Sequence, residues 1–189
     1  MEFRGIEKKE EGKYITRYDI TYETVDHKKK VYEMISRNKN IHSHEELAEH
    51  PADSVVLIMH DKTGEKILLN REYRMPCGEF VINFPAGLID PGEEFRESAK
   101  RELQEETGLT LIQIDEVLPE SFSAVGFSNE KNICIVGVAE GEFAPSSSTV
   151  EEIQAAWYTK EEVRELMKTE YFAARTQSYC YLWSKTTNK

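Results

Sequence analysis

Three glutamates, Glu102, Glu105 and Glu106, have the spacing best suited to chemistry in this sequence. At about 100° per residue, a helix would hold their carboxylates within an arc of about 100°. Like charges three or four residues apart destabilise a helix by roughly 0.2–0.5 kcal/mol per pair, so we expect a cation to compensate them. Carboxylates without His or Cys select a hard ion such as Mg²⁺ or Mn²⁺. On the helix alone, a solvated acidic face explains the pattern equally well.

A helix over residues 93–106 must position these carboxylates. Phe95, Ala99 and Leu103 recur every four residues, which predicts an apolar stripe on one side of about four helical turns. Gly108 stands just past the last turn and is typical of a helix stop. The carboxylates would then lie beside a stripe that packs against a core.

The remaining sequence predicts a mixture of strands and helices. Residues 14–25 and 30–36 are rich in Tyr, Ile, Thr and Val and predict an N-terminal hairpin that turns at 26–28. The fold class is therefore α/β or α+β, in one domain with an N-terminal extension. Further strands are predicted at 55–59, 66–70, 80–84, 112–117, 133–138 and 155–158, and further helices at 160–168 and 171–183.

Composition narrows the classes of protein. The chain has 189 residues, with 24 Lys and Arg against 35 Asp and Glu. The resulting net charge of −11 disfavours binding to the phosphate backbone of nucleic acids. Its longest apolar runs, 55–59 and 133–139, are far shorter than the roughly 20 residues of a membrane span. The charged N-terminus does not resemble a secretory signal, and three separated cysteines suit a reducing compartment. We expect a cytoplasmic protein.

The surroundings of the acidic helix decide between its two interpretations. Gly87, five residues, Glu93, seven residues and then the segment 101–109 (RELQEETGL) fit the Nudix box without a mismatch. A chance match is on the order of 10⁻¹⁰ per starting residue. The chain therefore resembles the Nudix hydrolases, a family with a mixed sheet sandwiched between helices, over about residues 50–170.

The resemblance assigns chemistry to the helix. In the family, the carboxylates at Glu102, Glu105 and Glu106 bind divalent cations, Mg²⁺ or Mn²⁺, that bridge a substrate pyrophosphate while water attacks phosphorus. Glu105 is assigned to catalysis as well as to metal binding. Arg101 is also assigned to catalysis, because it can reach Glu105 one turn away. A bound metal would let an acidic protein hold an anionic substrate.

Three further box positions have structural roles in this interpretation. Gly87 allows close approach of the backbone, and Gly108 ends the helix. Glu93 falls in the first helical turn, where capping explains it as well as metal binding does.

Short matches outside the box resemble the ADP-ribose pyrophosphatase branch. They are the segments 71–74 (REYR), 85–87 (PAG) and 126–130 (GFSNE). Carried over by position, they imply a metal-binding carbonyl at Ala86 and substrate-binding side chains at Arg74, Phe127 and Glu130. For Arg74, a surface strand residue is the alternative interpretation.

Two positions of this sequence depart from the pattern of the branch. Val125 stands where the branch carries proline, and Asn83 where the family often carries glutamate.

The catalytic base is assigned to Glu151 after the loop at 145–149, with a solvated loop acid as the alternative. Residues 1–47 are expected to form a homodimer through their strands, or merely to cover a sheet edge, and 48–189 form the hydrolase domain.

The expected activity is hydrolysis of ADP-ribose to AMP and ribose 5-phosphate with a divalent cation. The alternatives are another nucleotide sugar or dinucleotide as substrate, or a Nudix-like module that binds a nucleotide without cleaving it.

Overall fold

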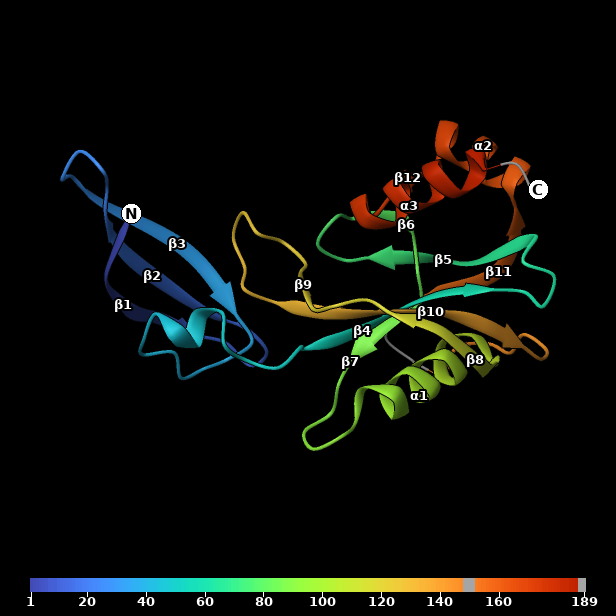
Figure 1. Cartoon of the computed structure of the whole chain (residues 1–189), viewed down its shortest axis with the longest axis horizontal. Helices are drawn as coiled ribbons and strands as arrows, with labels where there is room; N and C mark the ends of the chain where they lie inside the picture. The colour runs from blue at the N-terminus through green and yellow to red at the C-terminus, as the bar shows by residue number, and fades with distance from the viewer. Residues whose placement is uncertain (148–151, 187–189) are drawn as a thin grey trace. The chain divides into compact units, whose positions relative to one another are not determined.

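The computed structural model describes residues 1–147 and 152–186, which form two compact units (Figure 1). The first unit comprises Met1–Asp53 and Glu120–Asn132, and the second comprises Ser54–Pro119 and Ile133–Lys189. Within the described ranges, no helix is both long and apolar enough to cross a bilayer.

The first unit is built on an antiparallel sheet in the order β1–β2–β3. Alternate residues of these strands bury a small core around Tyr18, Ile20 and Met34. The predicted hairpin is present as β2 and β3, whereas β1 was not predicted because it is mostly charged and exposed. The elements are β1 (Glu2–Glu11), β2 (Thr16–Glu23), β3 (Lys29–Ser36), the 3-10 turn η1 (Glu45–Leu47) and β9 (Ser121–Phe122).

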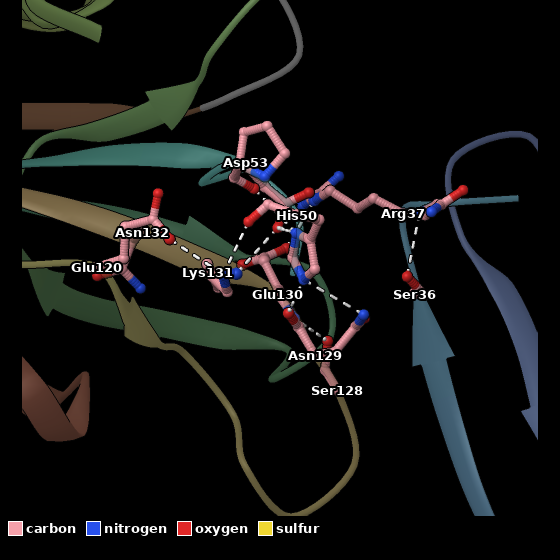
Figure 2. A network of polar contacts seen from close by, with 12 residues as sticks. Ser36, Arg37, His50, Asp53, Glu120, Ser128, Asn129, Glu130, Lys131 and Asn132 are labelled. Atoms are coloured by element: carbon pink, nitrogen blue, oxygen red, sulfur yellow. Dashed lines mark hydrogen bonds and ion pairs between the residues drawn. The ribbon is translucent and has the colours of Figure 1, made fainter. Parts of the chain in front are cut away.

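A loop over residues 123–130 is fastened within this unit by backbone and side-chain contacts. The Ile35 amide donates to the Phe127 carbonyl at 2.8 Å, and Arg37 Nε donates to Glu130 Oε2 at 2.6 Å. His50 Nε2 lies 3.0 Å from the Asn129 carbonyl oxygen (Figure 2). These contacts give the loop a defined conformation.

The second unit contains a mixed sheet with the strand order β12–β6–β5–β4–β10–β8, while β11 pairs with β5 and β7 with β4. β12 runs parallel to β6, and β11 runs antiparallel to β5. Its strands are β4 (Ser54–His60), β5 (Lys66–Arg74), β6 (Glu79–Asn83), β7 (Ala86–Leu88), β8 (Thr110–Val117), β10 (Lys131–Glu140, of which Lys131 and Asn132 belong to the first unit), β11 (Ile153–Thr159) and β12 (Tyr171–Phe172).

Helices cover both faces of this sheet: α1 (Phe95–Thr107) on one face, and α2 (Lys160–Thr169) with α3 (Ala174–Lys185) on the other (Figure 1). Alternation along β4 sends Val55 and Leu57 into the core with α1 and Val56 into the core with α2 and α3. A strand buried on both faces reads as an unbroken apolar run, as β4 does.

This architecture confirms the predicted fold class, a mixed sheet between helices. The predicted helix over 93–106 is α1, displaced by one or two residues because Glu94 serves as its N-cap. The short strands β7 and β9 were not predicted, since two or three residues are too few to show a period. The predicted helix over 171–183 was wrong at its start, because residues 171–172 pair with β6 as β12 and α3 begins at Ala174.

Candidate active site

Helix α1 is held by caps at both ends. The Glu94 carboxylate accepts a hydrogen bond from the Arg96 amide at 2.8 Å, which satisfies one of the free N–H groups of the first turn. Gly108 ends the helix with φ of 79°, a left-handed conformation that favours glycine. Ala99 and Leu103 are fully buried against the sheet, so the orientation of the helix is fixed by packing.

Glu93 and Arg101 form a clamp across the first turns of α1. Arg101 Nη2 and Nε donate to the Glu93 carboxylate at 2.8 and 3.0 Å, and Ser98 Oγ donates to it at 2.6 Å. These hydrogen bonds lower the pKa of Glu93 from its ordinary value of 4.5 to about 2. The hydrogen bonds to Glu93 also raise the pKa of Arg101. Glu93 therefore contacts Arg101 in place of capping the helix.

The same guanidinium reaches the predicted metal ligands. Arg101 Nη1 lies 2.7 Å from Glu102 Oε1 and 3.4 Å from Glu105 Oε2. The predicted contact with Glu105 is thus the longer of the two, and Glu93 and Glu102 are the nearer partners. Arg101 compensates the crowded negative charge that the helix sequence implied.

Glu106 lies on the side of α1 that faces the sheet and is 7% exposed. Its Oε2 accepts hydrogen bonds from Asn70 Nδ2 at 2.8 Å and from the Ala86 amide at 3.3 Å. Asn70 lies on β5 and Ala86 begins β7, so three separate elements meet at this oxygen. Glu106 therefore has hydrogen-bond partners on the sheet, whereas Glu102 and Glu105 contact Arg101.

Gly87 brings the backbone of β7 against the helix. A Cβ atom at this position would overlap the Glu102 carboxylate, so only glycine leaves that side chain its present place. Pairing of β7 with β4 through Val56 and Ala86 keeps this backbone fixed. The Gly87 backbone therefore lies against Glu102, while the expected approach of this glycine to a ligand stays a prediction.

The donors of this region fit a hard divalent cation in their chemistry: three carboxylates on successive turns of one helix, with a backbone carbonyl at Ala86 nearby. In the described part of the chain, no three His, Cys, Asp or Glu side chains are already gathered as a metal centre. Glu102 and Glu105 instead both contact Arg101.

Beyond Asn70, the same face of β5 continues into a cavity of about 510 Å³. Asn83 Nδ2 donates to Glu72 Oε1 at 2.9 Å, and Arg74 Nη1 lies 3.7 Å from Glu72 Oε2. The cavity thus joins an arginine with a largely buried carboxylate. Its lining includes Glu72, Arg74, Glu79, Asn83, Tyr171 and Phe172.

The structure does not bring all predicted residues into this unit. Phe127 and Glu130 belong to the first unit, where they hold the loop to Ile35 and Arg37. Glu151 lies outside the described residues.

Sequence reasoning did not identify Asn70 and Glu72 as residues of the site. The available signal was weak: Asn70 breaks the buried run Ile67–Leu69 with a polar side chain, and Glu72 follows two residues later on the same face. Their partner on α1, Glu106, is 36 residues away from Asn70 in the sequence.

A family model described as the NUDIX domain matches residues 50–179. A putative nudix hydrolase 2 of Caenorhabditis elegans is 29% identical over 142 residues, which are 74% of this chain and 61% of that protein. An ADP-ribose pyrophosphatase of Saccharomyces cerevisiae is 41% identical over 83 residues, 44% of this chain and 35% of that protein. The chain thus matches less than two thirds of the length of either relative.

Among solved structures, one described as an ADP compounds hydrolase superposes with a TM-score of 0.70 over 97% of this chain and 92% of that chain. Its sequence identity is 18%, so the likeness concerns the fold.

Proposed function

This chain belongs to the Nudix family, and on that premise we propose that it is a divalent-cation-dependent hydrolase of nucleoside diphosphate derivatives, cleaving ADP-ribose to AMP and ribose 5-phosphate. The observation that carries the proposal is the assembly around α1. The Glu102 carboxylate packs against the backbone of Gly87, and Arg101 donates hydrogen bonds to both Glu102 and Glu105. Glu106 is buried on the side of α1 that faces the sheet.

These side chains divide the work in the proposed reaction. Glu102, Glu105 and Glu106, with the Ala86 carbonyl, would hold Mg²⁺ or Mn²⁺. When bound, the ion neutralises phosphate oxygens and lowers the pKa of water. Arg101 keeps the carboxylates in place through its clamp on Glu93 until the ion arrives.

The cavity on β5 supports a substrate with a group attached beyond the diphosphate. Arg74 offers it a cation, and Glu72 and Asn83 offer hydrogen-bonding groups for hydroxyls. The yeast relative is named for ADP-ribose and the structural neighbour for ADP compounds, which agrees with this choice. Because Asn83 and Val125 depart from the branch, another nucleotide sugar or a dinucleotide is the alternative substrate.

Three assignments remain part of the proposal. Phe127 and Glu130 would contact substrate, Glu151 would act as the base, and the strands of residues 1–47 would form a homodimer. A cytoplasmic location is proposed with them.

A substrate screen tests the proposed function. The protein with Mg²⁺ would be incubated with ADP-ribose, other nucleotide sugars, dinucleotides and nucleoside triphosphates, and the products identified by mass. We expect AMP and ribose 5-phosphate in equal amounts from ADP-ribose. Cleavage of triphosphates alone would refute the proposal. Tight binding of ADP-ribose without any product over hours would instead indicate a binding module.

A further inference from the structure

Asn70 is a polar residue in the least polar part of the sheet. It is fully buried on β5, directly after Ile67, Leu68 and Leu69, which are also fully buried. The neighbouring strands place Asn83 on one side of it and Ala155 on the other. A buried amide costs stability unless its hydrogen bonds are satisfied, so an apolar residue would suit this strand position better.

One end of the Asn70 amide has a defined task. Its Nδ2 donates to Glu106 Oε2 at 2.8 Å, in a hydrogen bond to an ionised acceptor, the stronger kind. The carboxylate requires a donor, so the nitrogen of the amide and not the oxygen must face Glu106. With the Ala86 amide at 3.3 Å on the same oxygen, this contact fixes the position of Glu106 Oε2.

The other end of the amide has no partner. Asn70 Oδ1 is buried and accepts no hydrogen bond from any residue that the structure describes. Buried acceptors are nearly always satisfied in folded proteins by protein groups, water or an ion. An acceptor beside a carboxylate that would hold a hydrated cation has an available donor, namely a water molecule that accompanies the ion.

We propose that Asn70 is a positioning residue for the cation, holding Glu106 through its amide nitrogen and accepting a hydrogen bond from cation-associated water through its amide oxygen. This inference rests on the proposed function, because it assumes that Glu106 binds a divalent ion. Groups that orient metal ligands in this way typically change metal affinity or activity 10- to 100-fold when removed. Asn70 itself does not touch the reacting atoms.

Direct titration with Mn²⁺, followed by the electron paramagnetic resonance signal of the free ion, tests the inference without relying on turnover. We expect Asn70→Leu to weaken Mn²⁺ binding by about 10- to 100-fold. Its thermal midpoint should change little, since the variant removes the unsatisfied oxygen but also removes the donor to the buried Glu106 carboxylate. Saturating Mn²⁺ should then restore most of the lost turnover. Asn70→Ala, which keeps the backbone and adds no bulk, serves the same purpose if the leucine variant fails to fold.

The matched control is Asn83→Leu, one strand away, whose amide contacts Glu72 and not Glu106. Its Mn²⁺ affinity should stay within about twofold of the unaltered protein, a much smaller change than the tenfold expected of a ligand-orienting group. Folded Asn70 variants that bind Mn²⁺ as tightly as this control would overturn the inference while leaving the proposed function standing. If the unaltered protein binds no Mn²⁺ and cleaves no substrate, the proposed function itself fails.

Discussion

Replacing Gly87 by alanine should separate catalysis from stability. A methyl group at this position would occupy the place of the Glu102 carboxylate, which then has to turn away. The displaced atoms are the far end of a flexible side chain, and Gly87 lies in β7 without a left-handed φ. The fold can therefore accept the substitution, whereas the proposed metal ligand cannot keep its position.

The two effects differ in size. An off-rotamer Glu102 costs about 0.5–1.5 kcal/mol. Loss of glycine entropy in the unfolded chain returns about 0.4–1 kcal/mol. The net change in the free energy of unfolding is thus within about 1 kcal/mol, or about 2–4 °C in the thermal midpoint at this chain length. A displacement of about 1 Å in a reacting arrangement lowers turnover by about 100-fold.

Gly92→Ala supplies the matched control. Gly92 has φ of 85°, and a Cβ atom there would meet nothing within 4 Å. Alanine in that conformation costs about 1–2 kcal/mol of backbone strain, yet no carboxylate has to move. We expect this variant to melt a few degrees lower and to retain activity, the opposite of Gly87→Ala.

The assays are ADP-ribose hydrolysis at saturating Mg²⁺ and thermal unfolding followed by circular dichroism. A folded Gly87→Ala protein with activity within about threefold of the unaltered chain would refute the argument, since a 1 Å displacement is expected to cost about 100-fold. A loss of activity in Gly92→Ala as large as in Gly87→Ala would refute it equally, because glycine strain alone would then explain both results.

Three other outcomes follow from the geometry. Because the pKa of Glu93 is depressed to about 2, its ionised form stabilises the folded state above pH 4.5, so Glu93→Gln should lower the thermal midpoint at pH 7. That difference should shrink as pH falls from 4.5 toward 2, and a difference independent of pH would contradict it. Gly108→Ala combines a left-handed φ with a Cβ atom 2.6 Å from the Ala144 nitrogen, so urea unfolding should show a loss of about 2–5 kcal/mol. Thiol titration at pH 8 should label Cys77, which is exposed, while the other two cysteines react only after unfolding; burial raises the pKa of Cys180 to about 12, and its fast labelling in the native protein would argue against this packing.

Local sequence patterns were sufficient for much of the fold. The four-residue recurrence of Phe95, Ala99 and Leu103 located α1, because a helix pattern depends on neighbours one turn apart. Unbroken apolar runs located β4 and β5, because a strand pattern also depends on residues that are close together in the sequence. β1 was not predicted, because its sequence is mostly charged and shows no apolar pattern. It is a strand because it pairs with β2.

By itself, the sequence determined which residues were available for chemistry: three carboxylates on one side of a helix, an arginine among them, and Gly108 as the helix stop. Those relations lie within a few residues, where helical geometry alone sets the distances. Only the tertiary structure decided that Arg101 turns first to Glu93 and Glu102, that Gly87 abuts Glu102 and that Asn70 holds Glu106. Contacts between β5, β7 and α1 arise when separate elements pack together, and no local period encodes which side chains then meet.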